Sequence, residues 1–158
     1  MVKVLKRSFF FIVILMAAIQ FVRPSRTNSP VDPSREITAV HPAPPEVAST
    51  LERSCNDCHS NRTVWPWYSN VAPVSWLVAH DVNTGRSALN FSDWSAINVE
   101  KRRESVGKIC EEVRGGEMPM PQYVVLHPRA RLTTSDAQAL CSWALHIAPG
   151  AGVAEDKD

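Results

Sequence analysis

The sequence lacks the features that mark most enzymes and nucleic-acid-binding proteins. Its 158 residues contain 17 Lys and Arg against 16 Asp and Glu, so the net charge of +1 gives no overall field that would attract nucleic acid. No group of residues resembles an acid–base pair or an activated nucleophile. Neither internal repeats nor a strand-like alternation of apolar and polar residues is visible. We therefore expect an all-α domain that is not an enzyme.

Cysteine is scarce, and this scarcity excludes two common kinds of site. Of the 4 cysteines, Cys55 and Cys58 are close together, whereas Cys110 and Cys141 stand alone. A structural zinc site would need a second close pair of thiols or histidines. A thioredoxin-like dithiol would need a βαβ pattern around the pair, and none is visible. The close pair therefore needs another explanation.

The residue after the pair supplies that explanation. His59 completes the motif Cys-Asn-Asp-Cys-His over residues 55–59, which is the attachment pattern of c-type haem. On one turn of helix, the two thiols can reach the two vinyl groups of one porphyrin. His59 can then ligate the iron from one side. The motif predicts one covalently bound haem c held by Cys55, Cys58 and His59.

The basic residues are concentrated at the N-terminus. The first 45 residues contain 6 Lys and Arg against 2 Asp and Glu, and the remainder is mildly acidic. An apolar run from Phe9 to Val22 follows the first basic residues. It is long for a signal peptide and short for a full span of about 20 apolar residues. We expect residues 1–22 to anchor the chain in a bacterial inner membrane, with the haem domain in the periplasm. A cleaved export signal is the alternative.

Three further segments follow the apolar run. Residues 23–45 hold six of the 12 prolines and few large apolar side chains, which predicts an extended, semi-rigid linker. Residues 46–148 form the predicted haem-binding domain. The acidic end, residues 149–158, is expected to be disordered.

The spacing of apolar residues predicts four helices in the haem-binding domain. Val47, Leu51 and Cys55 form one stripe, so the first helix begins near residue 45 and runs into the haem motif. The second covers residues 74–82 and is ended by Asn83 and Gly85. The third covers about residues 98–114, and the last follows a capping box at residues 133–136 and ends near residue 146.

Several aromatic residues and one arginine are candidates for contacts with the haem. Trp65, Trp67 and Tyr68 lie in a loop that contains proline, and their rings either belong to the core or form a wall around the porphyrin. These two interpretations do not exclude each other. Arg86 follows the second predicted helix, where its guanidinium could bind a propionate. A salt bridge at the surface is the alternative.

The second axial ligand of the iron has four candidates. Met118 and Met120 lie between prolines in a loop, where methionine is poor core material. His80 and His127 are the other candidates.

The two isolated cysteines lie on apolar stripes of predicted helices. Cys110 belongs to the third helix and Cys141 to the last. If those helices pack together with Cα atoms within about 7 Å, a disulfide could form in an oxidising compartment. Two buried free thiols are the alternative.

The order of these features resembles that of a class I cytochrome c. More closely, the chain is similar to the small monohaem "haem-binding domain" family of exported bacterial proteins, over about residues 46–147. That resemblance implies an all-α fold around one covalent haem c, and its Gly-x-Met-Pro pattern favours Met118 as the distal iron ligand, with His80 as the rival. The matching residues are Cys55, Cys58, His59, Trp65-Pro66-Trp67-Tyr68-Ser69, Ala72-Pro73, Ser75-Trp76, His80, Gly85-Arg86, Leu89-Asn90-Phe91-Ser92, Gly116, Met118-Pro119, Tyr123, His127-Pro128 and Trp143.

Two functions agree with this pattern. If protein side chains fill both axial positions, the iron cannot readily bind a substrate, and one-electron transfer remains as its chemistry. We expect a membrane-tethered extracytoplasmic electron carrier whose partners are redox proteins at the membrane surface. An open distal site would instead suit a peroxidase-like enzyme or a gas sensor.

Overall fold

The computed structural model describes residues 2–148, and within that range the chain is helical without β-strands. The all-α prediction is therefore confirmed, whereas the tail predicted to be disordered, residues 149–158, lies outside the described residues. The α-helices are α1 (Val2–Ile19), α2 (Ile37–Val40), α3 (Pro45–Ser54), α4 (Asn56–His59), α5 (Val74–Ala88), α6 (Val99–Gly115), α7 (Pro121–Leu126) and α8 (Thr134–Ile147). Short 3₁₀ helices are η1 (Pro33–Arg35), η2 (Trp67–Asn70), η3 (Phe91–Ala96) and η4 (Pro128–Ala130).

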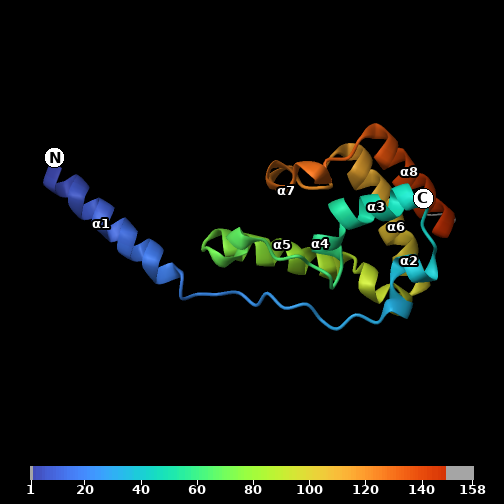
Figure 1. The fold of residues 1–158 in the computed structure, drawn as a ribbon, viewed down its shortest axis with the longest axis horizontal. Coiled ribbons are helices and arrows are strands. Elements are labelled where there is room, and N and C mark those ends of the chain that lie inside the picture. Colours follow the sequence, from blue (N-terminus) through green and yellow to red (C-terminus); the bar gives the residue numbers. More distant parts are fainter. Residues whose placement is uncertain (1, 149–158) are drawn as a thin grey trace, which may run out of the picture.

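Helix α1 projects from one end of the molecule and buries none of its residues (Figure 1). Between residues 2 and 148, no helix combines the length and apolar character needed to cross a membrane. The predicted membrane-spanning anchor is thus not supported. The physical reason is that Lys3, Lys6 and Arg7 occupy the first third of α1, which leaves its apolar part shorter than a span of about 20 residues.

The linker is not extended along its whole length, contrary to the prediction from its composition. It is extended as far as Asp32, but η1 and α2 then fold back onto η3. Ile37 in α2 is buried and belongs to the hydrophobic core. The ion pair of Glu36 with Arg62, at 2.6 Å, also holds this segment, and the abundance of proline concealed these contacts.

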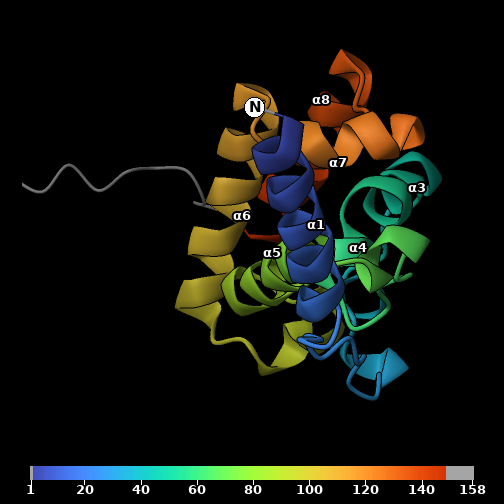
Figure 2. The same ribbon diagram turned by 90° about the vertical axis from the view of Figure 1, so that its left-hand side faces the viewer.

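The core lies where α3, α6 and α8 meet, with η3 closing one side (Figure 2). Asn98 caps α6 by accepting a hydrogen bond from the Lys101 amide, and Gly116 ends it in the left-handed conformation with φ of 76°. The predicted capping box is present at the start of α8. The fully buried side chains include Val47, Trp94, Val106, Leu140 and Cys141.

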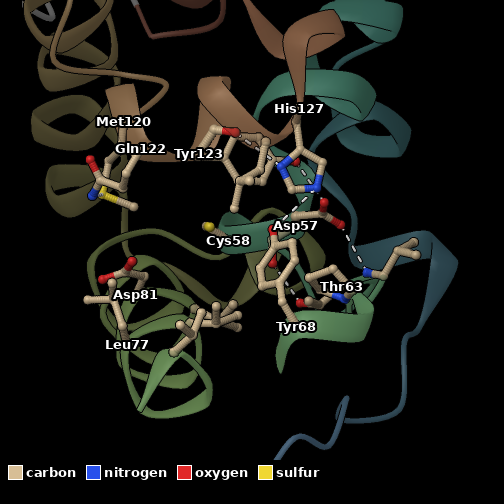
Figure 3. Close-up of a pocket in the computed structure, with 16 residues that line it drawn as sticks. Asp57, Cys58, Thr63, Tyr68, Leu77, Asp81, Met120, Gln122, Tyr123 and His127 are labelled. Atoms are coloured by element: carbon tan, nitrogen blue, oxygen red, sulfur yellow. Dashed lines mark hydrogen bonds between the residues drawn. The ribbon is translucent and has the colours of Figure 1, made fainter. Parts of the chain in front are cut away.

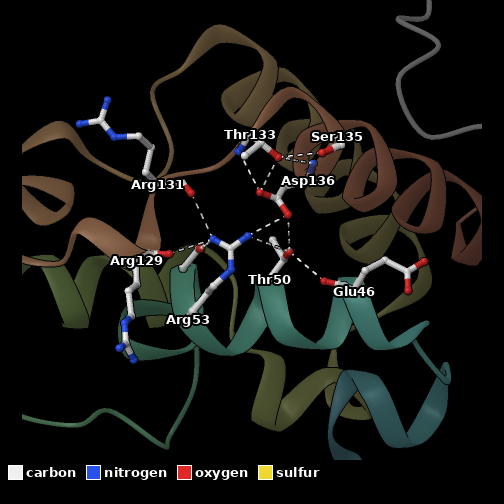
Figure 4. A network of polar contacts seen from close by, with 9 residues as sticks. Glu46, Thr50, Arg53, Arg129, Arg131, Thr133, Ser135 and Asp136 are labelled. Carbon is white, nitrogen blue, oxygen red and sulfur yellow. Dashed lines mark hydrogen bonds and ion pairs between the residues drawn. The ribbon is translucent and has the colours of Figure 1, made fainter.

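Arg53 joins α3 to the C-terminal part of the chain (Figure 4). Its guanidinium donates to the carbonyl oxygens of Arg129 and Arg131, at 3.0 and 3.2 Å, and forms a 2.8 Å ion pair with Asp136. Thr50 donates to the same carboxylate at 3.4 Å. Because α3 leads directly into the haem motif, these contacts fix the motif relative to α8.

Helix α5 is longer than predicted. It continues through Asn83 and Gly85 to Ala88, so neither residue ends it. Gly85 instead faces the backbone of Cys58, and a Cβ atom at this position would lie 2.6 Å from the Cys58 carbonyl oxygen. This glycine therefore serves close packing of α5 against α4.

Candidate cofactor site

The haem motif forms a short helix of its own. The chain turns at Cys55, whose φ and ψ of −125° and −40° end α3, and α4 then carries Cys58 and His59. The three residues are partly buried. Two of the cavities beside this turn are lined by its cysteines: one by Cys55 together with His59, and the other by Cys58.

The first cavity has a volume of about 230 Å³ and is mainly apolar. Leu51 of α3 and Leu140 of α8 form part of its wall, together with residues from α6. Cys55, His59 and Met118 all line it. The remaining lining residues include Ala88, Leu89, Phe91, Ile109, Val113, Pro119 and Leu132.

The orientation of His59 is fixed by a backbone carbonyl. Its Nδ1 atom lies 3.1 Å from the carbonyl oxygen of Leu89, which can only accept a hydrogen bond. Nδ1 therefore carries the proton, and Nε2 keeps its lone pair for a metal. Burial lowers the pKa of His59, which favours the neutral imidazole that ligation requires.

Met118 reaches this cavity because the loop after α6 is tied back to the helix. The amides of Glu117 and Met118 both donate to the carbonyl oxygen of Glu112, at 2.9 and 3.2 Å. The left-handed Gly116 allows this reversal of the chain. The structure thus brings His59 and Met118, which are far apart in sequence, to one cavity.

The histidine candidates for the second axial position do not line the cavity of His59. His80 is exposed on α5 and lines neither cavity, because Ala79 and Val82 form the buried side of that helix. His127 lines the second cavity, as does Met120. Among the four candidates, only Met118 shares a cavity with His59.

The second cavity has a volume of about 100 Å³, lies between α5 and α7 and is lined by Cys58 (Figure 3). Leu77, Val78 and Val82 of α5 form one wall. Met120 and Tyr123 contribute from the α7 side. The sequence did not indicate that Leu77, Val78 and Val82 would line one cavity together with Met120 and Tyr123.

A polar cluster borders this second cavity. The Tyr123 hydroxyl donates to Asp57 at 2.7 Å, and the Tyr123 ring stacks on that of His127 with centroids 4.1 Å apart. The Tyr68 hydroxyl lies 3.5 Å from Nε2 of His127. Burial and the Asp57 carboxylate both raise the pKa of Tyr123, so this phenol stays protonated. Asp57 was missed in the sequence, although it lies inside the haem motif.

The three predicted aromatic contacts have different environments. Tyr68 lines the second cavity. Trp67 is 78% exposed, and Trp65 donates from Nε1 to the Asn28 side chain at 3.3 Å. Neither tryptophan lines a cavity beside the motif, so the structure supports a wall role for Tyr68 only.

The Arg86 side chain donates four hydrogen bonds to other residues of the chain. Its guanidinium donates to Ser60 O at 2.8 Å and to Thr63 Oγ1 at 2.7 Å, both in the segment after the motif. It also donates to Thr27 O at 3.0 Å and to the Asn28 side chain at 2.7 Å. Because Arg86 lines neither cavity beside the motif, its predicted contact with a haem propionate has no support here.

These side chains have the chemistry that haem c needs. One free imidazole nitrogen and one thioether border the same apolar cavity, which Cys55 also lines, and Cys58 lines the second cavity. Burial raises the pKa of Cys55 to about 12 and that of Cys58 to about 11, so both are neutral thiols. A zinc site would need further ligands beside this pair, and residues 2–148 contain no group of three or more His, Cys, Asp or Glu residues that could hold a metal ion.

Comparison with known proteins agrees with this site. The family model described as "Haem-binding domain" matches residues 14–146. The chain belongs to the haem-binding domain family. No curated protein and no solved structure matches it. The family match begins inside α1 and includes the linker, so it extends beyond the range of about residues 46–147 over which the resemblance was seen.

Proposed function

We propose that this haem-binding domain protein is an extracytoplasmic monohaem c-type cytochrome that carries single electrons and is attached to a membrane through α1. The observation that carries the proposal is the shared cavity of His59 and Met118, whose imidazole and thioether would be the iron ligands of a bound haem. When bound there, haem supplies reversible one-electron chemistry.

The residues around the cavity have separate tasks in this proposal. The Leu89 carbonyl holds the His59 ring with Nε2 free, and the Glu112 carbonyl anchors the loop that carries Met118. A thioether and an imidazole as ligands would favour a higher reduction potential than two imidazoles. The apolar walls of the cavity would keep water away from a bound haem, which would also favour the lower charge of the reduced state.

Covalent attachment through Cys55 and Cys58 is part of the proposal. Two thiols separated by two residues before a histidine form the c-type attachment pattern. Attachment of this kind occurs outside the cytoplasm in bacteria, which agrees with an N-terminal segment that begins with basic residues and continues as an apolar helix.

Association of α1 with a membrane rests on the side chains of that helix. Phe9, Phe10 and Phe11 are exposed, and basic residues precede them. A helix with cationic and aromatic residues of this kind suits the lipid–water interface. Redox proteins at the same membrane surface are then the natural electron partners.

The test is production of the full chain together with a bacterial haem-attachment system. We expect the protein band to keep its haem colour after denaturing electrophoresis. The matched Cys55→Ser/Cys58→Ser variant should lose that colour. A colourless wild-type band, with both thiols open to alkylation, would overturn covalent attachment.

The visible spectrum of the same protein tests electron transfer against ligand chemistry. We expect six-coordinate low-spin iron that carbon monoxide does not perturb. A high-spin spectrum with ready binding of carbon monoxide or peroxide would instead identify an open distal site. That result would favour an enzyme or a gas sensor.

A further inference from the structure

One end of the domain carries an exposed group of apolar side chains. Trp67 is 78% exposed and Leu77 is 52% exposed, although both belong to an ordered part of the fold. Figure 1 shows η2 and the start of α5 at the end of the domain nearest α1. We call this group the η2–α5 face. It consists of Trp67, Val71, Val74, Trp76 and Leu77.

The chain that leaves α1 is fixed to this same face. The Gln20 side chain and the Ala72 backbone exchange two hydrogen bonds, with Nε2 donating at 3.1 Å and Oε1 accepting at 2.9 Å. Trp76 donates from Nε1 to the Val22 carbonyl oxygen at 2.7 Å. The apolar helix and the apolar face are therefore joined without a flexible spacer between them.

The linker residues that follow Val22 also bind the domain. Arg26 donates to the side chains of Ser69, at 3.3 Å, and Asn70. Asn28 donates to the carbonyl oxygen of Thr63 at 3.0 Å. These hydrogen bonds hold residues 20–28 against the domain.

The chemistry of this surface matches a lipid interface. Tryptophan combines an apolar ring with a polar N–H and is enriched where apolar chains meet water. Arg23 and Arg26 lie beside the exposed Phe21 and Val22 and would attract anionic head groups. The η2–α5 face is thus continuous with a helix of the same interfacial character.

We propose that the η2–α5 face lies against the surface of an anionic phospholipid bilayer, together with α1. This rests on the membrane attachment of α1 in the proposed function and adds a fixed orientation of the domain. Val74 and Leu77 also line the Cys58 cavity, so the Cys58 side of the cofactor site faces the membrane.

The experiment uses the full-length haem-loaded chain in vesicles of phosphatidylcholine and phosphatidylglycerol. The vesicles contain a phospholipid whose acyl chain bears a diazirine, and adducts formed under light are mapped by mass spectrometry. We expect adducts in peptides from α1 and also in peptides that cover residues 67–77. A Trp67→Ser/Leu77→Ser variant should lose the second set and keep the first.

The matched control is Val99→Ser, which removes a side chain that is 65% exposed at the start of α6 and should leave both sets of adducts unchanged. Adducts confined to α1 would overturn the orientation while leaving the attachment of α1 intact. Absence of adducts from both regions would overturn the attachment as well. Adducts confined to α1, together with a dimeric mass that the Trp67→Ser/Leu77→Ser variant loses, would assign the face to a second copy and also overturn the proposal.

Discussion

Gly85 and Cys58 lie so close together that a Cβ atom on Gly85 would come within 2.6 Å of the Cys58 carbonyl oxygen. Most glycines inside a helix weaken it by roughly 0.5–1 kcal/mol relative to alanine. Here the missing side chain lets α5 approach the helix that carries two of the three motif residues. The position of the haem motif therefore depends on Gly85, which follows Cys58 by 27 residues in the sequence.

Replacing Gly85 with alanine should destabilise the protein by about 1–3 kcal/mol, because backbone atoms of α4 would have to move. Urea denaturation of the haem-loaded protein measures the change, and the yield of covalent haem should fall with it. Gly115→Ala is the control, since the nearest atom to its Cβ would be 3.9 Å away. Equal stability of the Gly85→Ala variant and the wild type would contradict the close packing.

Met118→Ala should remove the second axial ligand. We expect the weak sulfur-to-iron charge-transfer band of the oxidised protein to disappear and carbon monoxide to bind the reduced protein. Met120→Ala is the matched control, because Met120 lines the Cys58 cavity rather than that of His59. A spectrum changed by His80→Ala and not by Met118→Ala would transfer the ligand role to His80.

Asp136 should contribute stability that depends on pH. Hydrogen bonds from the backbone and side chain of Thr133, together with Arg53, hold the pKa of Asp136 at about 2, below its usual 3.8. A lowered folded-state pKa stabilises the protein above the unfolded pKa of about 3.9, and this contribution is lost as pH falls through about 2.

Asp136→Asn should therefore lower the free energy of unfolding by about 1–2 kcal/mol at pH 7, with part of the loss due to the weakened capping box. The difference from the wild type should shrink as the pH falls below about 4. Chemical denaturation across this pH range checks both statements. A difference that stays constant down to pH 2 would show that the carboxylate charge is not involved.

Arg86→Gln should release the linker and the segment after the motif together. Loss of four hydrogen bonds from a partly buried guanidinium should cost about 2 kcal/mol. Limited proteolysis should then cut residues 23–32 faster than in the wild type. Arg103→Gln is the control, since Arg103 forms only an exposed 3.8 Å pair with Glu100. Unchanged proteolysis would contradict the role of Arg86 in holding the linker.

Cys110 and Cys141 should remain thiols. All four cysteines are free in the structure, and these two are buried where α6 packs on α8. Burial, assisted by the neighbouring Cys141, raises the pKa of Cys110 to about 12, which suppresses its reactivity. Alkylation of the haem-loaded protein should be negligible under native conditions and should modify both after unfolding. Mass spectrometry that finds them two hydrogens lighter and unmodified would establish a disulfide instead.

The sequence by itself determined the features that depend on neighbouring residues. The end of α6 near residue 114 and the capping box of α8 were predicted correctly, because the backbone conformation and hydrogen bonds involved span only a few positions. The haem motif is also local, since its two thiols and its imidazole are specified by their spacing in the sequence. The all-α class followed from the absence of a strand pattern.

Only the tertiary structure decided the relationships between distant segments. Gly85 was interpreted as a helix stop because Cys58 is not near it in sequence, and the contact of Arg86 with the linker was not predicted for the same reason. The linker was expected to be an extended tether, although Ile37 packs in the core and Asn28 binds the carbonyl oxygen of Thr63. Apolar spacing identifies which residues of a helix become buried but does not say against what. The partners are chosen by packing of the whole chain, which is why the shared cavity of His59 and Met118 emerged only from the fold.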